Sequence, residues 1–168
     1  DQIQFDGPRV TAGAGAGLPH LARLAAARGL AGLEFAAGIP ASLGGAVVMN
    51  AGAHGHAMQE VVRTVRAVTP DGERVFTASS LEYAYRTSVL QSTPAIVLEA
   101  MLELRRSDAA TVTQLMEEWL HHRSATQPIG PPSSGCVFRN PPHDHAGRLI
   151  DAAGGKGLQV GGAQVSAV

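Results

Sequence analysis

Three prolines, Pro128, Pro131 and Pro132, fall within five residues and constrain the fold more than any other feature of the sequence. Proline holds φ near −65° and has no backbone N–H, so neither a helix nor a central strand runs through such a cluster. Residues 127–134 are therefore the expected linker between two lobes, and two lobes that meet there leave a cleft between them. The expected domains are residues 1–127 and residues 128–168.

Hydrophobic spacing on either side of this linker predicts a mixture of helices and strands. The most regular helical pattern follows Asp108, which can cap a helix that ends near Arg123. Pro70-Asp71-Gly72 is a turn sequence between two β-prone runs, and it predicts a hairpin. The fold class is therefore α+β. Strands are expected at 9–12, 61–69, 73–77, 95–104 and 135–138, a glycine-broken strand at 160–168, and helices at 18–29, 46–51, 108–123 and 147–153.

Charge and cysteine content exclude several classes of function. Thirteen basic and 14 acidic side chains give a formal charge of −1, which removes the electrostatic case for binding nucleic acid or an anionic membrane. The single cysteine, Cys136, forms no intrachain disulfide, and no apolar run approaches the roughly 18 residues of a membrane span. These features favour a globular protein of a reducing compartment.

Both ends of the sequence have the composition of an interrupted chain. Residues 1–8 resemble neither a signal peptide nor a helix start, and residues 160–168 read as a strand with no closing element after it. We therefore expect the sequence to be a fragment.

The glycine turn Gly13-Ala14-Gly15-Ala16-Gly17 between a strand and a helix suggests a dinucleotide site. It departs from the G-x-G-x-x-G fingerprint, because Leu18 stands where the third glycine belongs and no acidic residue follows at the required distance. A structural turn is the favoured interpretation.

The loop Gly38-Ile39-Pro40-Ala41-Ser42-Leu43-Gly44-Gly45 is more specific. Its glycines, rigid proline and hydroxyl lie just before a short helix, where a flat or phosphorylated cofactor can approach the main chain closely. Asn50-Ala51-Gly52-Ala53 prolongs this surface of small residues. The residues alone leave a cofactor site and a tight connecting loop equally probable.

The segment 32–52, GLEFAAGIPASLGGAVVMNAG, resembles the flavin-binding signature of the UDP-N-acetylenolpyruvoylglucosamine reductases (MurB) of bacterial peptidoglycan synthesis. Residues 85–88, YRTS, are similar to the family's Tyr-Arg-x-Ser motif. Residues 135–141, GCVFRNP, are similar to its Gly-Ser-x-Phe-Lys/Arg-Asn-Pro motif. The stretches 146–154 and 161–166 resemble the segment that comes next. The motifs occur in family order and cover nearly the whole chain.

This resemblance implies a two-lobed α+β FAD-binding domain of the vanillyl-alcohol-oxidase/PCMH type, followed by a smaller α+β substrate-binding domain. On that basis residues 1–127 are the second part of the FAD domain and residues 128–168 the start of the substrate domain, both truncated. The implied reaction reduces UDP-N-acetylglucosamine enolpyruvate to UDP-N-acetylmuramate, with FAD as the cofactor and NADPH as the reductant. It also implies a bacterial cytoplasmic enzyme without nucleic acid, membrane or obligate protein partner.

The resemblance assigns roles to individual residues. Arg86 matches the family's catalytic arginine, whose planar fork holds a carboxylate as an enolate-like charge develops. Cys136 stands where the family's proton-donating serine usually does, and a thiol gives up a proton more readily than an alcohol. An ordinary solvated arginine and a small buried cysteine are the alternatives. Tyr85, Arg139 and Asn140 are the expected substrate-binding residues, and Gly38, Ile39, Pro40, Ser42, Gly44, Gly45, Asn50 and Gly52 the expected cofactor-binding residues.

Three departures from the family pattern bear on this assignment. The first flavin-binding strand–helix unit should precede residue 1, and the catalytic glutamate should follow Ser166. The interval from Asn140 to Gly147 is short, which is similar to the compact subclass that lacks an inserted loop in the substrate lobe.

Two further alternatives for the function stay open. A non-catalytic module that binds a nucleotide or UDP-sugar would keep this fold, as would another flavin oxidase of the same architecture. The histidine pairs 54/56, 121/122 and 143/145 lack cysteine partners and tetrahedral ligand spacing, so no metal site is expected. His54 falls where the flavin signature often continues with an aromatic residue, which suggests ring stacking near the cofactor.

Overall fold

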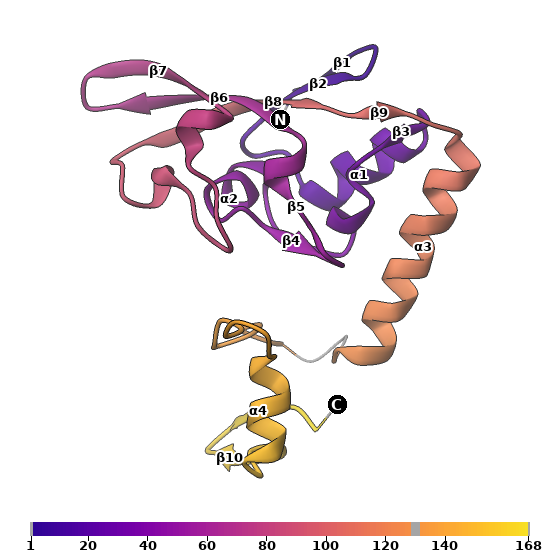
Figure 1. Ribbon diagram of the computed structural model, residues 1–168, viewed down its shortest axis with the longest axis vertical. Coiled ribbons are helices and arrows are strands. Elements are labelled where there is room, and N and C mark those ends of the chain that lie inside the picture. Colours follow the sequence, from indigo (N-terminus) through magenta and orange to yellow (C-terminus); the bar gives the residue numbers. More distant parts are fainter. Residues whose placement is uncertain (1, 129–131, 168) are drawn as a thin grey trace. The chain divides into compact units, whose positions relative to one another are not determined.

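The computed structural model describes residues 2–128 and 132–167 and divides the chain into two compact units, residues 1–122 and 123–168 (Figure 1). The predicted linker 127–134 lies partly outside the described residues, and its described part contains neither helix nor strand. Each unit is considered by itself below.

An antiparallel five-stranded sheet forms the first unit, in the order β1-β2-β8-β6-β7. The predicted hairpin is confirmed, since Pro70 and Asp71 make the turn between β6 and β7. The strand predicted at 95–104 is confirmed as β8. The first strand was not predicted, because its alternation covers only four residues. The strands are β1 (Ile3–Asp6), β2 (Arg9–Gly13), β6 (Val62–Thr69), β7 (Gly72–Thr77) and β8 (Ile96–Glu103).

Two helices, α1 (Leu18–Ala26) and α2 (Leu43–Val48), lie on one side of this sheet. The apolar side of α1 is buried, with Leu18 and Leu21 fully inaccessible to solvent, and α2 packs against β2 and β8. The predicted helix at 46–51 is therefore shifted by three residues. The shift has a local cause, because the Ser42 hydroxyl caps the helix by accepting the Gly45 N–H at 3.3 Å.

Short elements connect these layers and were not predicted. Two-residue strands pair as β3 (Leu30–Ala31) with β9 (Arg105–Arg106) and as β4 (Gly52–Ala53) with β5 (His56–Ala57). Such pairs give too little periodicity to be seen in a sequence. The 3₁₀ turns are η1 (Glu34–Ala36), η2 (Met58–Glu60), η3 (Ser79–Leu81) and η4 (Val89–Gln91).

The long helix α3 (Ala109–Thr126) confirms the helix predicted after Asp108. The Thr111 N–H and hydroxyl both donate to Asp108 Oδ2, at 2.9 and 3.1 Å. The bond from the Thr111 N–H, and after it the bond from the Thr111 hydroxyl, hold the pKa of Asp108 below its usual value. The buried residues of α3 are Val112 and Met116. Among the described residues no helix is both long and apolar enough to cross a membrane.

The second unit contains the helix α4 (Ala146–Ala152) and a hairpin of β10 (Gln159–Val160) and β11 (Ala163–Gln164). The predicted helix at 147–153 is confirmed within one residue. The glycine-broken strand is a hairpin, because Gly161 adopts φ +58° and turns the chain. The strand predicted at 135–138 is wrong, since Gly135 adopts φ +74° and no described strand pairs with this segment.

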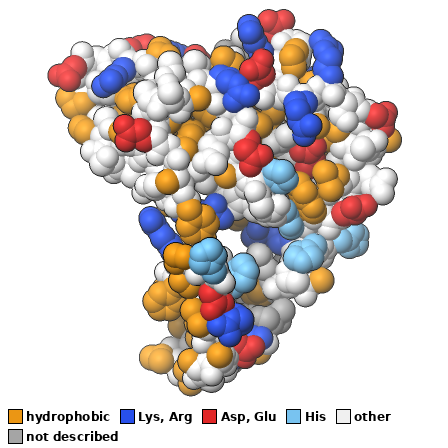
Figure 2. Space-filling model, in the orientation of Figure 1, with side chains coloured by type: hydrophobic (Ala, Val, Ile, Leu, Met, Phe, Trp, Pro, Cys, Tyr) orange, Lys and Arg blue, Asp and Glu red, His pale blue; other side chains and the backbone are white. Residues whose placement is uncertain are grey.

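Charged side chains of both signs are interspersed over the part of the first unit seen in Figure 2. On the sheet, Arg66 contacts Glu99 and Glu73 at 3.1 Å each, and Arg63 contacts Glu103 at 3.0 Å. Exposed pairs of this kind contribute little to stability. The opposite charges of these pairs neutralise one another, so the sheet presents no electrostatic field of a single sign.

Candidate functional site

Two glycine-rich segments lie side by side at the N-terminal end of α2. The Leu18 N–H donates to the Ala41 carbonyl at 2.9 Å, and the Leu43 N–H donates to the Ala16 carbonyl at 2.8 Å. The Gly44 N–H donates to the Ala14 carbonyl, also at 2.8 Å. The turn 13–17 and the loop 38–45 thus form one continuous surface of main chain and small side chains. The sequence did not predict that these two segments pair, because a glycine turn without the dinucleotide fingerprint does not indicate which segment packs against it.

The glycines of this surface serve different purposes. A Cβ at buried Gly44 would lie 2.9 Å from the Ala14 Cβ, and one at Gly52 would lie 2.3 Å from the His56 carbonyl oxygen. Both positions are therefore fixed as glycine by packing within the protein. Gly45 is exposed, and a Cβ there would lie 3.4 Å from the Ser42 Oγ, which is an ordinary contact. Gly45 therefore keeps its open side toward solvent, as does exposed Gly17 of the neighbouring turn.

The exposed part of the loop fits a flat, phosphorylated cofactor. Gly38 and Ile39 are half-buried, whereas Pro40 and Ser42 are exposed. The Ser42 Oγ already accepts the Gly45 N–H, so its hydroxyl hydrogen is left to donate to an outside acceptor. Together with the neighbouring glycines, this hydroxyl offers a donor beside exposed main chain, which is an arrangement suited to a diphosphate.

Asn50 follows α2 and is 2% exposed, with φ at +43°. Its Nδ2 donates to the Gln59 Oε1 at 2.8 Å and to the Ala84 carbonyl at 2.9 Å. Its Oδ1 accepts the Gln59 N–H at 3.0 Å. The carboxamide predicted to bind the cofactor is thus occupied by bonds within the protein.

Arg86 lies in a tight turn at the opposite end of α2 from the glycine surface. Ala84 and Thr87 exchange backbone hydrogen bonds of 3.2 and 3.1 Å, and Arg86 between them adopts φ +56°. Its guanidinium donates to the carbonyl oxygens of Asn50 and Gly52. Among the described residues no carboxylate forms an ion pair with Arg86. The guanidinium therefore donates to neutral acceptors, and its remaining N–H groups are available to bind an anion.

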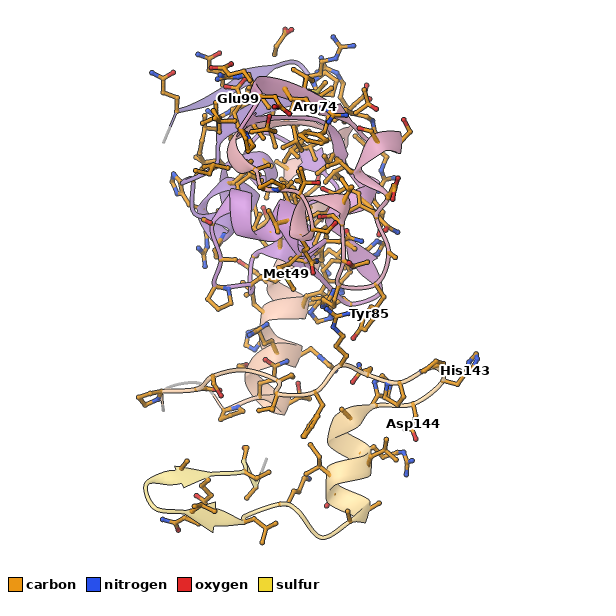
Figure 3. All side chains as sticks on the ribbon, turned by 90° about the vertical axis from the view of Figure 1, so that its left-hand side faces the viewer. Met49, Arg74, Tyr85, Glu99, His143 and Asp144 are labelled. Atoms are coloured by element: carbon orange, nitrogen blue, oxygen red, sulfur yellow. The ribbon has the colours of Figure 1, made fainter. Side chains whose placement is uncertain are left out.

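Further bonds hold this turn against the end of α2. The Ser88 hydroxyl donates to the Val48 carbonyl at 2.6 Å, and the Gln91 Nε2 donates to the Arg86 carbonyl at 3.1 Å. The Tyr85 ring lies beside the Arg86 guanidinium, 5.1 Å from centroid to Cζ, and is 53% exposed. Tyr85 and Met49 lie at the end of the unit away from Arg74 and Glu99 (Figure 3).

Tyr83, which precedes this turn, has a buried hydroxyl with no hydrogen-bond partner among the described residues. Burial raises the pKa of its phenol, because the low-dielectric surroundings disfavour the anion. We expect Tyr83→Phe to raise the free energy of unfolding by about 1 kcal/mol, since it removes an unpaired buried donor. Unfolding in urea measures this change.

The same substitution should alter the alkaline limit of stability. Because the folded pKa is raised, ionisation of Tyr83 favours the unfolded state, so this ionisation has no effect on stability below the unfolded pKa of about 10 and lowers stability as the pH rises above it. Tyr83→Phe should remove that part of the alkaline loss. Tyr85→Phe, at an exposed hydroxyl, is the matched control and should change neither quantity. Equal effects of the two substitutions would contradict the prediction.

Cys136, Arg139 and Asn140 belong to the second unit and are all exposed. The Asn140 Oδ1 accepts the Ala146 N–H at 3.0 Å, and its Nδ2 lies 3.4 Å from the His145 Nδ1. Asn140 thus closes the loop onto the start of α4. These three residues thus lie in one short segment of the second unit, whereas Asn50, Gly52, Tyr85 and Arg86 are brought into contact in the first.

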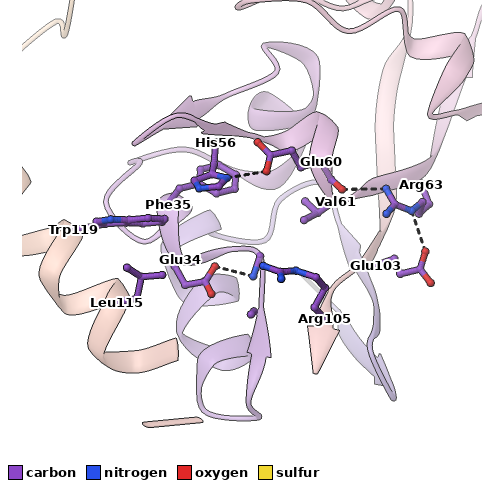
Figure 4. A pocket seen from close by; sticks show the side chains of 12 residues that line it. Glu34, Phe35, His56, Glu60, Val61, Arg63, Glu103, Arg105, Leu115 and Trp119 are labelled. Atoms are coloured by element: carbon purple, nitrogen blue, oxygen red, sulfur yellow. Dashed lines mark hydrogen bonds and ion pairs between the residues drawn. The ribbon is translucent and has the colours of Figure 1, made fainter. Parts of the chain in front are cut away.

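A pocket of about 300 Å³ lies elsewhere in the first unit (Figure 4). Its charged groups are largely paired, since His56 Nδ1 and Glu60 Oε2 are 2.8 Å apart and the Arg63 Nε donates to Glu103 at 3.0 Å. The Gly32 N–H donates to the largely buried Glu34 carboxylate at 2.7 Å. No residue that the sequence predicted for the site lines this pocket.

Trp119 of α3 lies at this pocket and stacks on a histidine. Its ring centroid is 4.9 Å from that of His54, with 9° between the planes, and 5.5 Å from that of His56. The stacking partner of His54 is therefore Trp119 within the unit. Within the described ranges, no group of three or more His, Cys, Asp and Glu side chains is arranged to hold a metal ion.

Comparison with known proteins gives two matching family models. Residues 1–78 match a model described as an FAD binding domain, and residues 127–168 match the C-terminal domain of UDP-N-acetylenolpyruvoylglucosamine reductase. The cofactor indicated for this chain is therefore FAD.

Relatives extend this likeness over the whole chain. The UDP-N-acetylenolpyruvoylglucosamine reductase of Bacillus subtilis is 45% identical over 99% of this chain and 55% of its own length. That of Heliobacterium modesticaldum is 50% identical over 97% of this chain and 52% of its own length. The chain thus spans about half the length of these relatives.

A crystal structure of UDP-N-acetylenolpyruvylglucosamine reductase (MurB) from Thermus caldophilus shares the fold. Its TM-score is 0.87 at 39% identity, with 97% of this chain and 60% of that chain covered. The matching models, the identities and the shared fold together show that the chain belongs to the UDP-N-acetylenolpyruvoylglucosamine reductase (MurB) family.

Proposed function

We propose that the protein reduces UDP-N-acetylglucosamine enolpyruvate to UDP-N-acetylmuramate, with FAD as cofactor and NADPH as reductant. The observation that carries this proposal is the Arg86 guanidinium, which donates to two neutral carbonyls from a left-handed turn and has no carboxylate partner among the described residues. It lies across α2 from the glycine surface, and six helical residues span roughly 9 Å. A site for an anionic substrate and a surface for a cofactor thus share one short helix.

This activity belongs to a protein of the relatives' length, of which the chain covers about half. We propose residues 1–127 as part of the FAD-binding domain and residues 128–168 as part of the substrate-binding domain. The proposed setting is the bacterial cytoplasm, where the product serves peptidoglycan synthesis and, through it, cell shape and division. No nucleic acid, membrane or obligate protein partner forms part of this proposal.

The residues divide the proposed work between binding and chemistry. FAD, when bound, supplies the hydride that reduces the enolpyruvyl double bond. The main chain of 13–17 and 38–45, with the Ser42 hydroxyl, holds the cofactor's diphosphate, and Gly52 keeps the adjoining turn close-packed.

Residues of each unit have a proposed role toward the substrate. The Arg86 guanidinium holds the substrate carboxylate and stabilises the negative charge that develops beside it. The Cys136 Sγ then donates the proton that quenches this charge. Tyr85, Arg139 and Asn140 bind the rest of the substrate.

The matched pair Gly45→Val and Gly44→Ala tests the cofactor surface in the full-length protein. Gly45 is exposed in a helix, so valine should leave the unfolding transition nearly unchanged while its side chain blocks FAD. Gly44→Ala should instead lower the free energy of unfolding by about 1 to 3 kcal/mol, because its Cβ meets Ala14. Flavin absorbance of the purified variants and urea unfolding measure the two effects. Full flavin occupancy in Gly45→Val would show that the surface is only structural.

The same preparation separates the alternative functions. A full-length protein without flavin absorbance would favour a non-catalytic nucleotide or UDP-sugar binding module. Oxygen consumption with a small alcohol would favour another flavin oxidase of this fold. Bleaching of the flavin by NADPH, with return of the colour on adding the enolpyruvyl sugar, is the result that we expect.

A further inference from the structure

The conformation of the Arg86 turn is imposed from outside. A non-glycine residue in the left-handed region is strained, and Arg86 has no side-chain amide that would relieve this strain locally. Within the turn, two backbone hydrogen bonds between Ala84 and Thr87 close it. The side chains of Ser88 and Gln91 hold its C-terminal side, through bonds to the Val48 and Arg86 carbonyls. The N-terminal side of the turn, at Ala84, is held by a side chain from another segment.

That segment is Asn50, which lies 34 residues away in the sequence. Its Nδ2 donates to the Ala84 carbonyl, and its own carbonyl accepts from the Arg86 guanidinium. Asn50 therefore contacts both the backbone at the start of the turn and the side chain at its tip. The orientation of the carboxamide is unambiguous, because Ala84 offers only an acceptor and the Gln59 N–H only a donor.

Asn50 is itself fixed. It is almost fully buried, and both Nδ2 hydrogens and the Oδ1 have partners within the protein. Asparagine tolerates the left-handed φ of +43° that this position requires better than other side chains of its size. Asn50 thus connects the end of α2 to η2 and to the Arg86 turn through hydrogen bonds that fix its side chain.

We propose that Asn50 is a positioning residue that holds the Arg86 guanidinium in place, and that it acts through the Ala84 carbonyl rather than by binding the cofactor. The proposal rests on the proposed function, in which Arg86 contacts the substrate carboxylate. A displacement of about 1 Å in such a group costs up to about 100-fold in rate.

A double-mutant cycle in the full-length protein tests this proposal. Asn50→Gly keeps the left-handed φ and removes only the side chain, and we expect flavin re-oxidation by the enolpyruvyl substrate to slow by about 10- to 100-fold. In an Arg86→Ala background the same substitution should cause no further slowing, because its effect passes through the arginine. Gln59→Leu is the matched control, since it removes the other partner of the Nδ2 and leaves the bond to Ala84. In the Gln59→Leu protein the flavin should be re-oxidised at the rate of the unsubstituted protein.

Hydrogen exchange gives a second readout that is independent of activity. The Thr87 amide, which donates to the Ala84 carbonyl, should exchange faster in Asn50→Gly than in Gln59→Leu, since only the former removes the second donor that anchors this carbonyl. If Asn50→Gly does not fold, Asn50→Asp takes its place, because a carboxylate still accepts the Gln59 N–H but cannot donate to Ala84.

The outcomes separate the inference from the function beneath it. Equal slowing by Asn50→Gly with and without Arg86, or no slowing at all, would overturn the positioning role. Unchanged re-oxidation in Arg86→Ala alone would overturn the proposed function, and the positioning role with it.

Discussion

Cys136→Ala is expected to slow re-oxidation of the reduced flavin by the enolpyruvyl substrate by about 10²- to 10⁴-fold, the range of a general acid. Reduction of the flavin by NADPH should stay near the unsubstituted rate, since only the second half-reaction requires the proton. Cys136 is exposed and free, so alanine should not disturb a packed core. Stopped-flow absorbance of the two half-reactions in the full-length protein measures both rates.

Cys136→Ser is the control for this prediction. A hydroxyl keeps a transferable proton at the same position, so much of the re-oxidation rate should remain. Alanine and wild-type proteins that re-oxidise at equal rates would remove Cys136 from the mechanism.

Arg86→Lys is expected to slow the same half-reaction by about 10²- to 10³-fold, the cost of removing one preorganised donor from a developing charge. Lysine keeps the positive charge, but its single ammonium cannot rest on the Gly52 and Asn50 carbonyls and also present a planar fork to a carboxylate. The free energy of unfolding should change little, because both residues carry the same left-handed strain.

A distant arginine provides the comparison for this substitution. Arg74 lies on β7, away from Tyr85, and Arg74→Lys should leave both half-reactions unchanged (Figure 3). An Arg86→Lys protein that re-oxidises as fast as the Arg74→Lys protein would show that the guanidinium fork has no catalytic role.

Features with local causes could be predicted from the sequence. The hairpin of β6 and β7 follows from its turn residues, and α3 follows from the Asp108 cap and its apolar spacing. The same logic explains the shift of α2, whose start depends on whether Ser42 is taken as the cap. The strand predicted at 135–138 is wrong for a related reason, since these β-prone residues find no partner strand in the part of the chain that the structure describes.

The assembly of the candidate site could not be predicted in this way. Sequence motifs singled out Asn50 and Arg86 separately, but their contact joins segments 34 to 36 residues apart. The pairing of the turn 13–17 with the loop 38–45 is equally non-local. Hydrophobic periodicity carries no information about such pairings, because they depend on how two loops meet after the sheet has formed.

The close approach of Gly44 to Ala14 has a consequence for how such proteins diverge. The two residues share a space that holds one methyl group, so positions 14 and 44 cannot enlarge independently. A lineage that acquires a larger residue at one position must already have the smallest residue at the other. Because Ala14 belongs to the turn 13–17 and Gly44 to the loop 38–45, substitutions at these two positions should be correlated across the family, which links the two segments at this contact.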